Sequence, residues 1–477
     1  MRYKVKAIHF VGIGGVGMSG IAEVLSNLGY SVTGSDLKSS SAVTRLESLG
    51  IKVLIGHSVK NIIDADVLVI SSAISSENPE VLEAKRIGIP VVPRATMLAE
   101  LMRFKQGIAI AGTHGKTTTT SLVASVLAEA AMDPTYVIGG RLESVGANAQ
   151  LGEGEFIVVE ADESDASFLL LQPVICVVTN IDRDHLDAYD QDFERLKTAF
   201  VNFITRIPFY GKAVLCSDDP GIKAILPNLS RHVITYGFNE DAQVRASIPK
   251  RVDDKMCYTV NRQIGSVIFP PLRVRLNCLG KHNVLNSLAA IALATELEID
   301  DDVICQALET FQGVGRRLES YGSVKLGTKR VTLYDDYGHH PSEVEPTLAA
   351  IREAYPQKRL VLVFQPHRYT RTRDFFDEFV RVLSKADVLI MTEVYEAGEL
   401  PIPGVDSAGI ARSIRMISGL NPVCVRGVEM ALNVLVKLIE DDDVIITMGA
   451  GTIGSLPSAI VLASKQSQPE KSNRVEL

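Results

Sequence analysis

The sequence has no long hydrophobic run, few cysteines and no excess of positive charge. Its most apolar stretches end after a few residues in Gly, Asp or Asn, whereas a membrane span needs ~20 apolar residues in a row, so we expect a soluble protein. The six cysteines never approach a CxxC spacing, which excludes a zinc knuckle or disulfide framework and fits a reducing compartment. With 49 Lys and Arg against 57 Asp and Glu, the net charge is −8, so the chain would repel nucleic acid and anionic membranes. An anionic ligand must find a local basic pocket.

The rest of the composition is that of a folded protein. Hydrophobic residues make up 46% and charged residues 22%, with 36 Gly and 20 Pro, which excludes global disorder, collagen and fibrous repeats. At roughly 150 residues per domain, the 477 residues predict about three domains. The basic N-terminus imitates a signal peptide, but His9 and the glycines after it interrupt the apolar segment that export requires. We therefore expect a cytoplasmic protein.

Short apolar runs alternate with amphipathic stretches along most of the chain, which predicts an α/β fold of parallel sheets covered by helices. Around residues 231–279 short alternating pieces with Pro and Gly predict an antiparallel flank, closed by helices near 282–297 and 301–311. The predicted domains are a Rossmann-like domain at 1–105, a P-loop ATPase-like domain with that flank at 106–315, and a second Rossmann-like domain at 316–464. A disordered tail is predicted at 465–477. Strands of the last domain are predicted at 331–335, 359–364, 387–392, 421–425 and 443–447.

Gly12, Gly14 and Gly17 lie in a glycine-rich turn between a predicted strand and a predicted helix. Such glycines let the backbone approach a diphosphate, whose charge is met by the helix N-terminus. Asp36 follows at the end of the next predicted strand, where an acidic side chain binds a ribose hydroxyl. Alone, the pattern is typical of a nicotinamide dehydrogenase, and a tight turn that binds nothing is the plainer alternative.

A second phosphate loop begins at Gly112 and runs through Lys116 and Thr117, again between a strand and a helix. Its amides would cradle a polyphosphate, Lys116 would neutralise the β- and γ-phosphates, and Thr117 would place its hydroxyl on Mg²⁺. The position five before Gly115 is Ile110 rather than glycine, so the loop should be shorter than a standard P-loop. A hydride-transfer enzyme has no need of an ATP loop. The two loops together therefore favour a nucleotide-linked substrate on the first domain and ATP on the second.

Acidic residues and a histidine follow the next two predicted strands. They are Glu160, Asp162, Glu163 and Asp165, then Asp182, Asp184, His185 and Asp187. Because neighbouring parallel strands open toward one crevice, these side chains could reach a Mg²⁺ bound to ATP. For any single acid, a solvated loop charge is the alternative.

Polar residues also gather at two predicted strand ends of the last domain. Asp335 to Pro341 reads DDYGHHP, with the proline placed to start a helix. Gln365 to Arg373 includes His367, Arg368, Arg371 and Arg373, a local anion site in an otherwise acidic protein, unless it is a solvated charge run. Arg316 and Arg317 lie at the predicted second hinge, where a guanidinium could grip a phosphate.

Six segments together resemble the cytoplasmic Mur ligases of peptidoglycan synthesis, in the right order from about residue 6 to residue 460. They are Gly112 to Thr120, Glu160 to Asp165, Asn180 to Asp187, Lys281 to Asn286, Gly313 to Arg317 and Asp335 to Pro341. The resemblance implies ATP-dependent amide formation through an acyl phosphate, with two Mg²⁺ ions. The implied reaction joins L-alanine to the lactyl carboxylate of UDP-N-acetylmuramate. A ligase that attaches a ready-made tripeptide and a non-catalytic nucleotide-binding scaffold remain as alternatives.

The resemblance also implies roles for individual residues. Lys116 would stabilise the transferring phosphoryl group, Thr117 and Glu160 would hold the first Mg²⁺, and His185 would hold the second. Implied ATP contacts are Gly112, Thr113, His114, Gly115, Lys116, Thr117, Thr118, Asn283, Arg317 and Asp335. Implied UDP-sugar contacts are Gly12, Gly14, Gly15, Gly17, Asp36, Ser71 and Ser72, and implied amino-acid contacts are Tyr337, His339, His367, Arg368 and Arg371. Sister ligases carry a carbamoylated lysine, but Lys197 is out of register here, so we predict no such modification.

Overall fold

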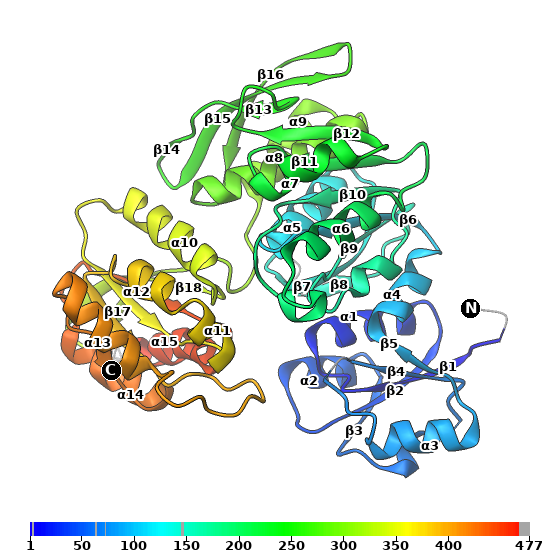
Figure 1. Ribbon diagram of the computed structural model, residues 1–477, viewed down its shortest axis with the longest axis horizontal. Coiled ribbons are helices and arrows are strands. Elements are labelled where there is room, and N and C mark those ends of the chain that lie inside the picture. Colours follow the sequence, from blue (N-terminus) through cyan, green and yellow to red (C-terminus); the bar gives the residue numbers. More distant parts are fainter. Residues whose placement is uncertain (2–3, 63, 72, 145–146, 467–477) are drawn as a thin grey trace, which may run out of the picture. The chain divides into compact units, whose positions relative to one another are not determined.

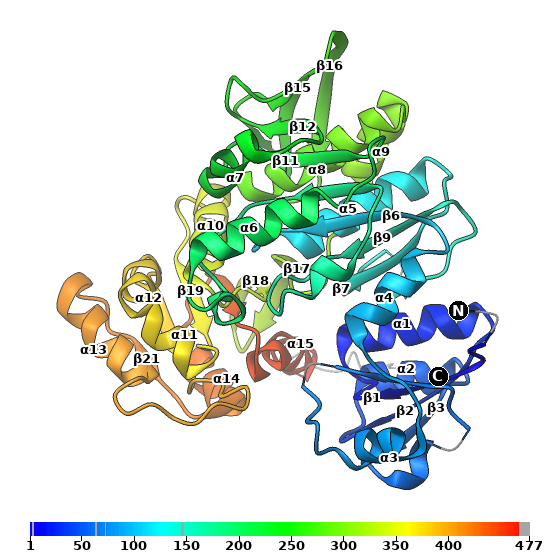
Figure 2. The same ribbon diagram turned by 45° about the vertical axis from the view of Figure 1, so that its right-hand side comes forward.

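The computed structural model describes residues 1, 4–62, 64–71, 73–144 and 147–466. It has the three-domain α/β architecture that the sequence predicts, with one sheet in each domain (Figure 1, Figure 2). Contacts divide the chain into two compact units, Met1–Cys278 with Asn283–Val314, and Leu279–His282 with Gly315–Leu477. The first unit holds the first two sheets and the second unit holds the third. The boundaries between the domains stay predictions.

The first sheet is parallel, with strand order β3-β2-β1-β4-β5. Its strands are β1 (Ala7–Val11), β2 (Ser31–Asp36), β3 (Lys52–Ile55), β4 (Val67–Ile70) and β5 (Val91–Pro93). Its helices are α1 (Val16–Asn27), α2 (Ser41–Ser48), α3 (Pro79–Ile87) and α4 (Arg94–Met102). The strand order reverses between β1 and β4, and ligands of open parallel sheets bind beyond the carboxyl ends of the strands at such a point. The loops after β1 and β4 therefore frame the predicted UDP-sugar site.

The second sheet has 11 strands. Its parallel part is β6 (Gln106–Ala111), β7 (Thr135–Leu142), β9 (Phe156–Glu160), β10 (Ile175–Val178), β11 (Lys212–Cys216) and β12 (His232–Gly237). The remaining strands are β8 (Ala147–Gln150) beside β7, and β13 (Val244–Ala246), β14 (Lys250–Val252), β15 (Lys255–Ile264) and β16 (Val267–Leu276) at the other end. At this end of the sheet antiparallel pairing begins between β13 and β15, and β12 pairs in parallel with both β11 and β13. The antiparallel flank is confirmed, but it starts later than predicted.

Helices of the second sheet are α5 (Lys116–Glu129), α6 (Phe193–Ile204), α7 (Pro220–Ile225), α8 (Lys281–Glu296) and α9 (Asp301–Thr310). The last two confirm the helices predicted to close this domain. Strand β6 lies between β9 and β10 in the sheet. The segments that follow these three strands therefore meet at one edge, where the phosphate loop and the acidic residues lie.

The third sheet has strand order β17-β18-β22-β19-β20-β21. Its strands are β17 (Glu319–Leu326), β18 (Lys329–Asp336), β19 (Leu360–Phe364), β20 (Val388–Met391), β21 (Val423–Cys424) and β22 (Val444–Met448). The strands predicted in this domain are all present, and the unpredicted β17 forms an antiparallel hairpin with β18. Its helices are α10 (Pro341–Ala354), α11 (Tyr369–Asp374), α12 (Phe376–Leu383), α13 (Ser407–Ser418), α14 (Gly427–Leu438) and α15 (Leu456–Gln466).

The buried apolar side chains explain why the first two sheets form one unit. A single cluster runs from Ile8 in β1 through Met102 in α4 to Ile108 in β6 and on to Val314. Helix α4 also packs against the short 3₁₀ helix η2 (Ser167–Leu170) of the second domain. Within the part of the chain that the structure describes, no helix is long and apolar enough to cross a membrane.

Candidate functional site

The phosphate loop between β6 and α5 is held by the segment that follows β10. Gly112 has φ +126°, and a Cβ at this position would lie 2.1 Å from the Thr179 hydroxyl, so only glycine fits. The Asn180 side chain accepts from the His114 N–H at 2.8 Å and donates to the His114 carbonyl at 2.9 Å. The Thr179 hydroxyl donates to the same carbonyl at 2.6 Å. The neighbouring strand therefore fixes the loop, and the sequence pattern did not reveal these contacts.

Lys116, the first residue of α5, turns its ammonium back toward the loop. Its Nζ donates to the Gly112 carbonyl at 2.6 Å and lies 2.7 and 2.9 Å from the two carboxylate oxygens of Glu163. Burial raises the pKa of Glu163 to about 7, opposed by Lys116. Burial alone would lower the pKa of Lys116, but Glu163 and Asp162 raise it above its ordinary value. The site therefore keeps a positive charge at the N-terminus of α5, where a phosphate would bind.

Thr117 and Glu160, two of the predicted metal ligands, converge on a glycine pair in β7. A Cβ at Gly139 would lie 2.5 Å from Glu160 Oε2, and a Cβ at Gly140 would lie 2.8 Å from the Thr117 methyl. The other oxygen of Glu160 accepts from the Gly139 N–H at 2.8 Å. A hydroxyl and a carboxylate are oxygen donors of the kind that Mg²⁺ prefers. The donor set therefore fits the predicted ion.

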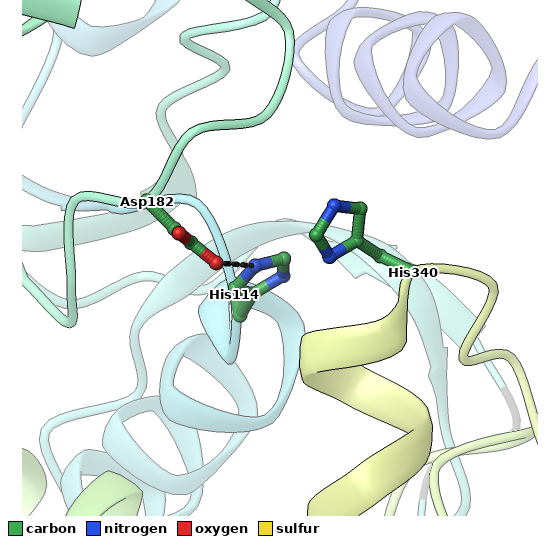
Figure 3. A group of neighbouring side chains, drawn as sticks. All are labelled: His114, Asp182 and His340. Atoms are coloured by element: carbon green, nitrogen blue, oxygen red, sulfur yellow. Dashed lines mark hydrogen bonds and ion pairs between the residues drawn. The ribbon is translucent and has the colours of Figure 1, made fainter. Parts of the chain in front are cut away.

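The histidines of the predicted site pair with acids on the loop after β10. His114 Nε2 lies 3.1 Å from Asp182 Oδ2 (Figure 3), and the Asp182 N–H donates to the Thr113 hydroxyl at 2.9 Å. His185 has φ +57° and its Nε2 lies 3.4 Å from the Asp184 carboxylate. The segment containing the second predicted metal ligand is thus tied to the phosphate loop through Asp182. Whether His185 holds an ion stays a prediction.

Residues of β2 accept hydrogen bonds from the glycine-rich turn after β1. The Ser35 carbonyl accepts from the N–H groups of Gly12 and Ile13, and Asp36 Oδ2 accepts from the Gly14 N–H at 2.9 Å. A Cβ at Gly12 would lie 3.4 Å from the Ser71 hydroxyl, so the loops after β1 and β4 do meet. Ser72 lies outside the described residues. The sugar-binding roles of these residues stay predictions.

Within the first unit, one arginine connects the first phosphate turn with the acidic segment after β9. Arg94, at the start of α4, lies with its Nη1 2.9 Å from the position that a Cβ on Gly17 would take. Its Nη2 lies 3.3 Å from Asp162 Oδ2. Burial alone would raise the pKa of Asp162, but Lys116 and hydrogen bonds from Ser164 hold it below its ordinary value. Asp162 therefore stays ionised between the two cations, a bridge that the sequence did not predict.

Two further predicted residues of the first unit lie beside the phosphate loop. Asn283 in α8 is buried and accepts from the Asn286 amide at 3.1 Å. The Asn286 carbonyl oxygen lies 2.6 Å from where a Cβ on Gly115 would be. Thr118 is buried in the first turn of α5. Helix α8 therefore closes one side of the loop.

In the second unit, Asp335 is the penultimate residue of β18 and is fully buried. Its carboxylate accepts from Arg316 Nε at 2.8 Å and from the Thr447 hydroxyl at 2.6 Å. Arg317 lies over the ring of Tyr337, with its guanidinium carbon 5.1 Å from the ring centroid. Arg316 also lies over this ring, at 5.2 Å, so the two arginines differ in that Arg316 pairs with the buried Asp335 as well.

The predicted amino-acid contacts of the second unit gather around stacked rings. The His367 ring lies 5.3 Å from the rings of both His339 and Tyr395. Burial, together with His339 and the arginines nearby, lowers the pKa of His367 to about 3. The imidazole is therefore neutral at physiological pH, and the positive charge comes from Arg368 and Arg371. His340, also drawn in Figure 3, caps the N-terminus of α10.

Two other features lie apart from these residues. Lys197 Nζ pairs with Glu194 at 2.6 Å on α6, and the absence of a carbamoylated lysine stays a prediction. A cavity of about 280 Å³ lies against the C-terminal half of α5, and residues of β7 and α9 line it with Tyr136 and Phe311. None of the predicted site residues is among those that line it.

Comparisons with known proteins place the chain in one family. Family models match residues 7–106 (Mur ligase family, catalytic domain), 110–294 (Mur ligase middle domain) and 316–451 (Mur ligase, glutamate ligase domain). The UDP-N-acetylmuramate–L-alanine ligase of Ralstonia nicotianae is 58% identical over 100% of this chain and 99% of its own. That of Cupriavidus necator is 57% identical over 98% of each chain. The crystal structure of UDP-N-acetylmuramate-alanine ligase MurC from Thermotoga maritima is 29% identical with TM-score 0.81, covering 97% of this chain and 100% of that one.

Proposed function

Because the chain belongs to the Mur ligase family, we propose that it joins L-alanine to the lactyl carboxylate of UDP-N-acetylmuramate at the expense of ATP. It is an ATP-dependent ligase of peptidoglycan precursor synthesis, and the relatives that it matches over their whole length carry this activity in their names. The structural observation that carries the proposal is the guanidinium of Arg94, which lies beside Gly17 of the first phosphate turn and pairs with Asp162, the neighbour in sequence of the Lys116 partner Glu163. Arg94 thus links the turn proposed for the sugar nucleotide to the acidic segment beside the lysine proposed for ATP.

The proposed chemistry has two steps. A lactyl carboxylate oxygen attacks the γ-phosphorus of ATP, the bond from that phosphorus to the β–γ bridging oxygen breaks, and ADP leaves. The alanine amine then attacks the acyl carbon, the carbon–oxygen bond to phosphate breaks, and inorganic phosphate leaves as the amine loses its proton. Phosphoryl transfer needs positioning and charge neutralisation more than covalent help from the protein. Lys116 and the amides at the N-terminus of α5 supply them here.

The proposal includes Mg²⁺, held by the Thr117 hydroxyl and the Glu160 carboxylate, with His185 serving a second ion. When bound, the ions would neutralise phosphate charge. The chain's own part is to hold the Thr117 and Glu160 side chains against the neighbouring Gly140 and Gly139 of β7. Asn283, Arg317 and Asp335 are proposed for ATP, and the residues around His367 for alanine. The proposal places the reaction in the cytoplasm.

The test is phosphate release by the purified protein with ATP, Mg²⁺, UDP-N-acetylmuramate and either L-alanine or the tripeptide. We expect release that requires L-alanine. Faster turnover with the tripeptide would identify the recycling activity instead, and no release with either would favour a nucleotide-binding scaffold.

A further inference from the structure

Glu163 is the acid of its cluster that faces the phosphate-loop lysine. It is fully buried, and both carboxylate oxygens lie within 2.9 Å of Lys116 Nζ. Glu160 instead faces Gly139, and Asp162 faces Arg94. Three acids within four positions of the sequence therefore have three different partners, and only one of them fixes the lysine.

The ammonium of Lys116 has three N–H donors. The three shorter contacts are to the Gly112 carbonyl at 2.6 Å and to the Glu163 carboxylate, with Oε2 at 2.7 Å and Oε1 at 2.9 Å. The remaining contact is to the Thr113 carbonyl at 3.2 Å. This longest bond is the one that a phosphate oxygen would replace at least cost.

The backbone of Glu163 is itself fixed. Its carbonyl accepts from the buried Tyr189 hydroxyl at 2.6 Å and from the Ala166 N–H at 3.0 Å. A buried ion pair adds little net stability, because the desolvation of two charges offsets their attraction. A carboxylate placed so rigidly against Lys116 is therefore better explained by orientation of the lysine than by stability.

We infer that Glu163 is a positioning residue of the proposed reaction, which holds the Lys116 ammonium so that one N–H is directed to the transferring phosphoryl group. The inference rests on the proposed function of Lys116. It assigns Glu163 no contact with ATP or with a metal ion, in contrast to the role predicted for its cluster.

The Glu163→Gln variant removes the charge and keeps the shape of the side chain. We expect kcat to fall about tenfold or more, because a charge-assisted hydrogen bond is about twice as strong as a neutral one. We expect ATP to bind several-fold more tightly, since a negative charge beside the polyphosphate site is lost. A merely structural residue would not move kcat and affinity in opposite directions.

The experiment measures phosphate release by the full chain, and binding of a non-hydrolysable ATP analogue by calorimetry. Glu309→Gln is the control away from the site, where it breaks a Lys–Glu pair of 2.9 Å with Lys255 and a pair of 3.1 Å with Arg275. An unchanged kcat, or weaker binding together with a lower kcat, overturns the inference. If the Gln variant does not fold, Glu163→Asp keeps the charge but shortens the side chain, and a lower kcat with unchanged ATP affinity is expected.

The wild-type chain separates the two proposals. If it releases phosphate with L-alanine and the Gln variant matches it, the inference on Glu163 fails while the proposed function stands. If it releases none, the proposed function fails, and tighter binding of the analogue to the Gln variant still supports the pairing of Glu163 with Lys116.

Discussion

Replacing Lys116 with alanine should affect both activity and stability, with different pH dependences. Loss of one donor that stabilises transition-state charge costs about 10²–10³ in kcat. The same substitution leaves Glu163 buried without its cation, and breaking a buried pair costs about 3–5 kcal/mol. Because the free energy of unfolding of a domain is only about 5–15 kcal/mol, the variant should be measurably less stable but still folded.

The sign of the pH effect follows from Glu163. Burial raises the pKa of this carboxyl to about 7 with Lys116 present, and loss of the lysine raises it further. The folded state then holds a proton that the unfolded state releases. The free energy of unfolding therefore decreases as the pH rises above the ordinary pKa of a glutamate side chain. The free energy of unfolding of the variant should therefore be close to that of the wild type near pH 5 and lowest near pH 8.

Urea unfolding at these two pH values, together with phosphate release, is the assay. The double variant Lys116→Ala/Glu163→Gln is the control, and it should regain stability at pH 8 without regaining activity. Equal destabilisation at both pH values would refute the reasoning about Glu163. Retained phosphate release in Lys116→Ala would refute the catalytic role of the lysine.

Three further substitutions test other parts of the chain. Arg94→Ala should lower the free energy of unfolding by under about 1 kcal/mol, because its ion pair with Asp162 is partly exposed. It should raise the KM for UDP-N-acetylmuramate about tenfold or more. Steady-state assays with Arg86→Ala as control check this, and an unchanged KM would contradict it. Gly112→Ala should abolish ATP binding in calorimetry, because its Cβ would collide with Thr179; normal affinity would show that the loop can relax. The pKa of His367 is about 3 in the folded protein, so the wild type should lose stability as the pH falls from about 6.5 to about 3. His367→Phe should not show this loss. Thermal unfolding at pH 4.5 and 7 checks this, and equal pH dependence in both proteins would count against it.

The fold was largely predictable because its elements repeat a local pattern. Buried parallel strands are continuous apolar runs, so those of the third domain stand out from the sequence. The edge strand β17 was missed because its exposed and buried residues alternate without an apolar run. The start of the antiparallel flank was misplaced at β12, because the direction of pairing depends on the neighbouring strand and not on the strand's own residues.

The site was predictable where one residue type is required by its own backbone or chemistry. Gly112 and Lys116 belong to this class, since a left-handed backbone and a phosphate contact each demand a particular residue. Arg94 was missed because nothing in its local sequence distinguishes it from a solvated charge. Its partners at Gly17 and Asp162 are brought to it only by the packing of α4 between the first two domains.

The sequence by itself determined the α/β architecture, the two phosphate turns and the family, because periodicity, glycine spacing and motif order are properties of the linear chain. Only the tertiary structure decided which acid serves which partner. Glu160, Asp162 and Glu163 are neighbours in sequence, but they face Gly139, Arg94 and Lys116. Identical carboxylates acquire different roles from burial and from the partners that separate segments bring to them.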